Sequence, residues 1–212
     1  MKKGGGVELL RKAELRAALA SSEVDSLFLD PLLEKDQVGD VTIDLRLGYD
    51  FHVSILTRNP SIELVSIQAT KRRSIGTYFQ ETRRDLGDTF VLYPHQVVIA
   101  TTLEYLSLPT NVYADILSRS SYTRLGIHVA TMIQPGFRGC VPLELFNHGN
   151  SAVELIIGSR LCQARFFKSS TGGSYLPTSG TRKYFGEVRP TISRADQDKE
   201  LRQLINVRDF DL

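Results

Sequence analysis

Apolar and polar residues alternate along most of this 212-residue chain, which is the pattern of half-buried β-strands. The clearest alternation runs from Val41 to Leu47, where aliphatic residues take every second position. After residue 89, short apolar runs are separated by turn residues, a spacing typical of an antiparallel sandwich or barrel rather than of a parallel α/β sheet. The further predicted strands are 51–56, 90–92, 96–103, 112–117, 127–133, 141–146, 153–157 and 161–167.

Two regions depart from this strand pattern. A helical apolar stripe covers residues 7–19 and predicts an N-terminal helix. Residues 57–88 are polar and irregular, and we interpret them as a solvated insertion rather than a patch for nucleic acid. The chain is therefore predicted to form one domain over 1–168, with an insertion at about 54–88, followed by an arm or lid at 169–212.

Composition excludes several classes of protein. With 26 basic and 24 acidic side chains, the formal charge of +2 leaves no electrostatic footprint for a nucleic-acid partner. No apolar run approaches the length of a membrane span, and the N-terminus lacks the apolar core of a signal peptide. Two cysteines cannot build a disulfide framework or a four-ligand zinc site. We therefore expect a cytoplasmic protein that binds neither nucleic acid nor membranes.

The strongest candidate chemistry lies in the segment Ser-Arg-Ser-Ser-Tyr-Thr-Arg-Leu-Gly at 118–126. Guanidinium groups and hydroxyls match phosphate oxygens, and Glu144 on a predicted strand could move protons on a molecule that the phosphate anchors. Two other interpretations stay open. The segment could be a short serine-capped helix with its arginines in water. Glu144 could be an ordinary glutamate on the outer face of a strand whose inner face carries Val141, Leu143 and Leu145.

Other catalytic signatures are missing from the sequence. The zinc-deaminase signature, the nucleophile elbow of serine hydrolases, the Walker loop and the dinucleotide-binding fingerprint do not occur. His128 lies on an apolar strand, where a lone histidine is more often structural than catalytic. The residues thus indicate a nucleotide enzyme that carries no zinc.

Several short motifs follow one another in a recognisable order. Arg-Ser-Ser-x-x-Arg-Leu-Gly begins at Arg119, x-Pro-Gly-Phe-x-Gly spans 134–139, and Leu-Glu-Leu-Phe-Asn spans 143–147. Val-Thr-Ile-Asp-Leu-Arg-Leu-Gly precedes them at 41–48, and Lys-Tyr-Phe-Gly follows at 183–186. Together the motifs resemble those of the dCTP deaminases, in the trimeric dUTPase-like superfamily. The resemblance implies a mainly β fold, a distorted antiparallel β-barrel or jelly-roll with an N-terminal helix and a C-terminal arm, and hydrolytic deamination of dCTP to dUTP and ammonia.

The resemblance also implies roles for individual residues. Glu144 matches the catalytic glutamate, Ser120 matches the serine that helps to hold the attacking water, and Arg124 matches the arginine beside it. Glu187 stands where the family usually has glutamine. The nucleotide-binding residues implied in this way are Arg119, Ser120, Ser121, Tyr122, Thr123, Arg124, Gln134, Pro142, Leu143, Glu144, Tyr175, Lys183 and Glu187.

Cofactor and assembly follow from the same resemblance. Mg²⁺ is expected to arrive bound through the substrate triphosphate, so no residue is assigned as a metal ligand. One carboxylate that changes its protonation could support deamination without zinc. The family forms homotrimers with sites at subunit boundaries, so Arg119 or Arg124 could serve a pocket that a neighbouring chain helps to build.

Gln134 bears on the product. The superfamily usually has an aspartate here, which holds the deoxyribose 3′-hydroxyl and, in the pyrophosphatases, helps to orient the water that attacks phosphorus. A glutamine cannot take a proton from water, so we expect dUTP rather than dUMP. The alternatives are a dUTP pyrophosphatase or bifunctional enzyme that gives dUMP, and a nucleotide-binding regulator without turnover.

Overall fold

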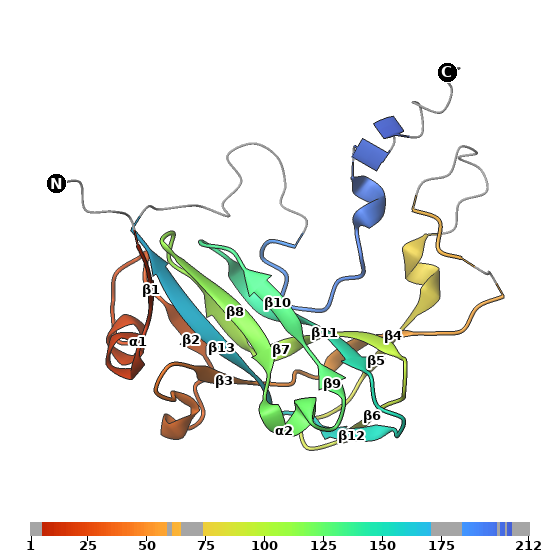
Figure 1. The fold of residues 1–212 in the computed structure, drawn as a ribbon, viewed down its shortest axis with the longest axis horizontal. Helices are drawn as coiled ribbons and strands as arrows, with labels where there is room; N and C mark the ends of the chain where they lie inside the picture. Colours follow the sequence, from red (N-terminus) through yellow and green to blue (C-terminus); the bar gives the residue numbers. More distant parts are fainter. Residues whose placement is uncertain are drawn as a thin grey trace.

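The strands of the protein form two large antiparallel sheets and a two-stranded ribbon (Figure 1). The computed structural model describes residues 6–58, 61–64, 74–170, 184–198, 200–201 and 203–204. The first sheet has the order β1-β13-β8-β10, with β3 also paired to β13. Its strands are β1 (Val7–Leu9), β3 (Ile43–Arg46), β8 (Val112–Ser118), β10 (Ala130–Ile133) and β13 (Arg160–Ser169).

The second sheet carries the candidate site and has the order β5-β4-β7-β11-β9, with β2 also paired to β7. Its strands are β2 (Phe28–Asp30), β4 (Asp50–Ser54), β5 (Phe79–Arg83), β7 (Val97–Ser107), β9 (Ile127–His128) and β11 (Arg138–Asn147). The ribbon joins β6 (Thr89–Leu92) to β12 (Val153–Ile156). The helices are α1 (Lys12–Leu19) and α2 (Ser120–Thr123), with 3₁₀ turns η1 (Lys35–Gln37), η2 (Ile75–Tyr78) and η3 (Ala195–Gln197).

One hydrophobic core joins the inner faces of the sheets. Phe51 of β4 stacks on Phe90 of β6 with ring centroids 4.3 Å apart, and Leu143 and Phe166 are fully buried. Burying side chains of this size stabilises a fold by about 1.5–3 kcal/mol each. The predicted mainly β, antiparallel architecture is confirmed, although the described strands form separate sheets rather than a closed barrel. Within the described residues, no helix is both long enough and apolar enough to span a membrane.

The predicted N-terminal helix over 7–19 is too long at its start. Residues Val7–Leu9 form β1 instead, which pairs with the end of β13, and the helix begins at Lys12. The carboxylate of Glu14 accepts a hydrogen bond from the Arg11 N–H at 2.8 Å and so satisfies a free amide at the helix start. Pairing with a distant strand has overridden the local helical pattern.

Long-range pairing also changes two other predicted segments. The described part of the insertion is irregular only in part, because β5 pairs antiparallel with β4 and becomes the edge of the second sheet. The single strand predicted at 127–133 is split at Val129 into β9, which pairs with β11, and β10, which pairs with β8. One apolar run therefore crosses from the second sheet to the first.

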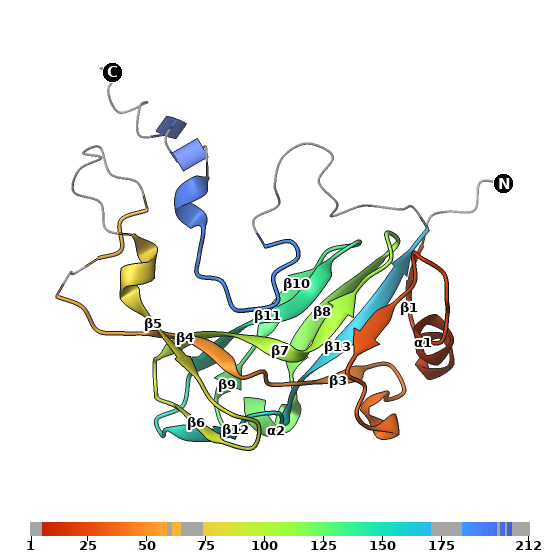
Figure 2. The same ribbon diagram turned by 180° about the vertical axis from the view of Figure 1, so that it is seen from behind.

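Residues 184–198, here called the strap, return to the second sheet after a stretch outside the described residues (Figures 1 and 2). The Gly186 N–H donates to the Arg138 carbonyl at 2.9 Å, and the Cys140 N–H donates to the Glu187 carbonyl at 3.0 Å. Gly139 lies between these two bonds with φ at +145°, and a Cβ there would lie 2.4 Å from the Glu187 oxygen. The strap is therefore attached to β11 by a backbone contact that requires glycine.

Candidate active site

A row of three side chains crosses the outer face of the second sheet. His52 on β4 lies opposite Ile99 on β7, and Ile99 lies opposite Glu144 on β11. Directly opposed residues of antiparallel strands present their side chains on the same face. Val141, Leu143 and Leu145 of β11 are fully buried in the core, as the sequence alternation predicts. Glu144 therefore faces away from the core, toward the strap.

A pocket of about 240 Å³ lies between the sheet and the strap, over the part of this row that holds Ile99 and Glu144. Pro142 and Glu144 of β11 line one side, together with Ile99 and Thr101 of β7. The opposite side is formed by the strap residues Tyr184, Glu187, Arg189, Thr191 and Ser193. The pocket thus combines two carboxylates, several hydroxyl groups and a guanidinium group in a largely apolar surround.

Glu144 is one of two carboxylates that line this pocket. Its side chain is exposed toward the pocket, yet the protein atoms around it displace enough water to raise its pKa above the ordinary value for glutamate. A carboxyl group with a raised pKa binds a proton more readily than an ordinary glutamate, which favours both the uptake and the return of a proton. This is the property that an acid–base catalyst requires.

Glu187 brings a second carboxylate to the pocket, and its charge is compensated within the strap. Its Oε1 atom accepts a hydrogen bond from Nη2 of Arg194 at 2.9 Å. The Arg194 N–H also donates to the hydroxyl of Tyr184 at 3.0 Å, so the strap folds back on itself around the pocket. An ion pair of this kind lowers the repulsion that a lone acid would exert on an anionic ligand.

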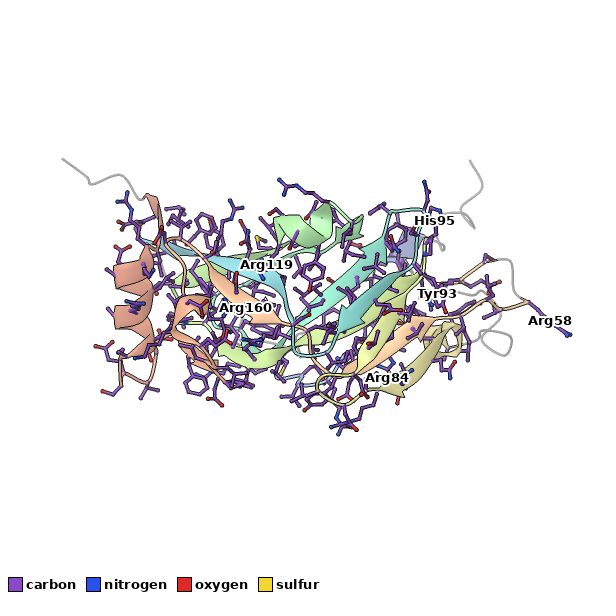
Figure 3. All side chains as sticks on the ribbon, turned by 90° about the horizontal axis from the view of Figure 1, so that it is seen from below. Arg58, Arg84, Tyr93, His95, Arg119 and Arg160 are labelled. Atoms are coloured by element: carbon purple, nitrogen blue, oxygen red, sulfur yellow. The ribbon has the colours of Figure 1, made fainter. Side chains whose placement is uncertain are left out.

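The segment predicted to bind phosphate forms the short helix α2 after Arg119. Nη1 of Arg119 donates to the Arg160 carbonyl at 3.2 Å, and Nε lies 3.7 Å from Oδ2 of Asp44 (Figure 3). The short helix of the alternative interpretation is confirmed, but its serine cap is wrong, because no side chain caps this helix. The hydroxyl of Ser118 accepts from the Val129 N–H at 2.6 Å instead. Arg119 is therefore held against β3 and β13.

The remaining residues of this segment lie on the surface. Ser120, Ser121, Thr123 and Arg124 are exposed, whereas Tyr122 is partly buried and reaches Ser159 Oγ at 3.3 Å. None of the residues 119–124 lines the pocket that holds Glu144 in the same chain. The structure therefore does not bring Ser120 and Arg124 to Glu144 within one chain.

The other predicted residues divide into those at the pocket and those elsewhere. Pro142 and Glu187 line it with Glu144, whereas the buried side chain of Leu143 points into the core and leaves only its backbone available. Gln134 is exposed in the turn between β10 and β11, where its carbonyl accepts from the Phe137 N–H. The predicted arm residues Tyr175 and Lys183 lie outside the described residues.

Several residues at the pocket were missed by the reading of the sequence. Ile99 and Thr101 line the pocket because of strand register, and no role was predicted for the strap residues Arg189 and Thr191. His52 shares their face of the sheet but does not line the pocket. Alternation places positions 52, 99 and 101 on the outer faces of their strands, which was the available signal. Their meeting with Glu144 depends on pairing between distant strands, which alternation does not specify.

The described residues contain no group of three or more His, Cys, Asp or Glu side chains arranged to hold a metal ion. Burial raises the pKa of the Cys140 thiol to about 11 and also raises the pKa of Cys162. Both thiols are therefore protonated at neutral pH, whereas metals bind the thiolate.

Comparison with known proteins identifies the family to which the chain is similar. A family model described as dCTP deaminase-like matches residues 9–169. A "dCTP deaminase, dUMP-forming" of Methanobrevibacter smithii is 33% identical over 187 residues, which cover 85% of this chain and 93% of the relative. A "dCTP deaminase" of Natronomonas pharaonis is 34% identical over 198 residues, which cover 91% of this chain and 97% of the relative.

A solved structure agrees with these sequence matches. The crystal structure of 2′-deoxycytidine 5′-triphosphate deaminase from Agrobacterium tumefaciens matches with a TM-score of 0.57 at 27% identity. The alignment covers 76% of this chain and 48% of that chain, about half of its length. Because the family match spans most of the chain and includes the strands around Glu144, this protein belongs to the dCTP deaminase-like family.

Proposed function

We propose that this protein catalyses the hydrolytic deamination of dCTP to dUTP and ammonia. The observation that carries the proposal is Glu144, which lies in a pocket under the strap with a raised pKa, at the position that matches the family's catalytic glutamate. The curated relatives named as dCTP deaminases support the substrate.

Glu144 can supply the proton transfers that this reaction needs. As the oxygen of water bonds to C4 of the cytosine ring, the carboxylate takes one proton from that water and passes it to ring N3. Glu144 then takes the second water proton from the new hydroxyl and passes it to N4, so that the amino group departs as ammonia when the C4–N4 bond breaks. The ring proton stays on N3 of the uracil product, so atoms and charge balance without a redox partner.

A homotrimer explains the position of the phosphate segment. Ser120 and Arg124 are exposed and do not line the Glu144 pocket of their own chain, although the family resemblance gives both a place beside the substrate. In the proposed assembly, this segment of one subunit completes the pocket of the next. Mg²⁺ would bind to the triphosphate oxygens and neutralise part of their charge. The two unpaired thiols agree with a cytoplasmic setting for this assembly.

Deamination is expected to survive treatment with a zinc-selective chelator when Mg²⁺ is in excess. The reason is that the protonated thiols of Cys140 and Cys162 are poor zinc ligands and that Glu144 can transfer protons without a metal-bound hydroxide. Ammonia release is measured before and after chelation, with a zinc-dependent cytidine deaminase as the control. Activity that is lost and then restored by zinc would contradict a zinc-free mechanism.

Incubation with dCTP and Mg²⁺ is expected to yield ammonia and dUTP, with little dUMP. Gln134 cannot act as a base toward a water that attacks phosphorus, whereas a carboxylate at this position could. Anion-exchange separation of the nucleotides measures the product directly. The matched variant Gln134→Asp restores the carboxylate and is expected to increase the share of dUMP.

A bifunctional enzyme that gives dUMP is the second candidate function. It is favoured by the relatives of Methanobrevibacter smithii and Methanothermobacter thermautotrophicus, both named "dCTP deaminase, dUMP-forming". Release of dUMP and pyrophosphate by the unmodified protein in proportion to ammonia would establish this candidate and reject dUTP as the product. Binding of dCTP without any release of ammonia would reject both candidates in favour of a regulator.

A further inference from the structure

The strap is held at a second point, on β4, which lies two strands from Glu144 on the same face of the sheet. Nε2 of His52 lies 2.8 Å from the carbonyl oxygen of Pro190. A carbonyl can only accept a hydrogen bond, so Nε2 carries the hydrogen and donates it. The His52 side chain is only 14% exposed, and its Nδ1 atom lies 3.9 Å from Glu81 of β5.

The described part of the insertion lies against the same stretch of the strap. A Cβ added to Gly76 of η2 would lie 3.2 Å from Cδ1 of Ile192, so the insertion and the strap are in close contact. Gly76, Phe79 and Glu81 line a small cavity together with strap residues 190–192. In Figures 1 and 2, the blue η3 end of the strap and the gold η2 turn both stand above the second sheet.

The stretch that is held in this way also forms a wall of the candidate active site. Arg189 and Thr191, the two neighbours of Pro190, both line the Glu144 pocket. Nε of Arg189 lies 3.8 Å from Oδ2 of Asp50, which adds a second contact between the strap and β4. The strap therefore contacts β4 and the insertion on one side and faces the substrate pocket on the other.

We infer that His52, supported by the insertion, is a positioning residue that holds the strap wall of the pocket in place for dCTP. This inference rests on the proposed function, and it gives the 54–88 insertion a role. His52 does not act on the reacting atoms, because it lies two strands from Glu144, about 10 Å away in a sheet of ordinary spacing. It acts through Pro190, since a pocket wall displaced by about 1 Å can lower catalytic efficiency on the order of 10²-fold.

The variant His52→Ala removes the hydrogen bond to Pro190 and leaves Glu144 in place on β11. We therefore expect the KM for dCTP to rise by about tenfold with little change in kcat, because the strap contributes binding surface rather than proton transfer. His52→Gln keeps an N–H donor on a side chain of similar reach and is expected to restore KM to within about threefold of the unmodified protein. The exposed His95, which lies outside the pocket, provides the control variant His95→Asn with unchanged kinetics.

The insertion is tested by Gly76→Val, which adds side-chain volume toward Ile192 without touching the core. This variant is expected to raise KM in the same direction as His52→Ala. Because it changes an exposed turn, it remains informative if His52→Ala reduces stability. An unchanged KM in both variants would overturn the inference.

A second measurement is independent of the nucleotide. Hydrogen exchange at the amides of Cys140 and Gly186, which bond the strap to β11, reports whether the strap is attached in the unliganded full-length protein. His52→Ala is expected to accelerate exchange at both amides, and His52→Gln and His95→Asn to leave it near the original rate. Unchanged exchange in His52→Ala would refute the positioning role, whereas faster exchange in a protein that releases no ammonia from dCTP would refute only the proposed function.

Discussion

The variant Glu144→Gln is expected to lower the turnover of dCTP by roughly 10²–10⁴-fold while leaving the fold intact. The amide preserves the shape of the side chain but can neither take a proton from water nor return it to the ring. Stability should change little, because Glu144 lies on the outer face of β11 and the core residues on either side of it are untouched. Ammonia release at saturating dCTP measures the loss.

A matched control for this variant is Glu154→Gln. Glu154 is also an exposed glutamate on a strand, but it lies on β12 and does not line the pocket. The substitution Glu154→Gln should leave the turnover of dCTP within about twofold of that of the unmodified protein, as is usual for surface positions outside a site. Near-normal turnover by Glu144→Gln, with thermal unfolding midpoints equal in both variants, would show that Glu144 is not the proton-transfer residue.

The free energy of unfolding is expected to fall by up to about 3 kcal/mol as the pH rises from about 4.5 to above 7, because of Glu104. This residue is fully buried, with Oε1 accepting from Nε2 of Gln37 at 2.8 Å and Oε2 accepting from the Arg46 N–H at 2.9 Å. Burial raises the pKa of its carboxyl group from 4.5 to about 7. A tenfold difference in proton affinity between the folded and unfolded chain is worth ~1.4 kcal/mol.

The sign follows from which state binds the proton more tightly. Below pH 4.5, Glu104 is protonated in both states, so its contribution to stability is fully present. As the pH rises toward 7, the unfolded chain loses the proton first, and the folded protein must then hold either a bound proton or a buried charge. Stability is therefore lost with rising pH through the pKa of about 7.

Urea unfolding between pH 5 and pH 8 measures this effect. Glu104→Gln serves as the comparison, because its side-chain oxygen can still accept a hydrogen bond and it does not titrate. The free energy of unfolding of the variant should fall less with rising pH than that of the unmodified protein, by up to about 3 kcal/mol. Equal slopes in the two proteins would show that Glu104 does not titrate in this range.

The sequence predicted those features of the fold that depend on local pattern. Alternation placed most strands correctly and put Glu144 on an outer face, opposite to its buried neighbours. It was wrong where distant partners decide the structure: Val7–Leu9 pairs with β13, β5 pairs with β4, and the run at 127–133 divides between two sheets. Pairing over such separations leaves little trace in the local sequence.

The candidate site, too, was predicted only in part. The family resemblance identified Pro142, Glu144 and Glu187, and the structure places all three at one pocket. It also identified Ser120 and Arg124, which lie outside that pocket in the same chain. No pattern indicated His52, because its part in the site depends on the register of β4 with β7 and on the passage of the strap.

The attachment of the strap through Gly139 has a consequence for redesign of the protein. The contact joins two backbone atoms, the Cys140 nitrogen and the Glu187 oxygen, and the only side-chain requirement is that position 139 carries none. The side chains of Thr191 and Ser193 line the pocket and take no part in this contact. Libraries that vary these two positions can therefore explore new nucleotide substrates while the segment that carries them stays bonded to the sheet.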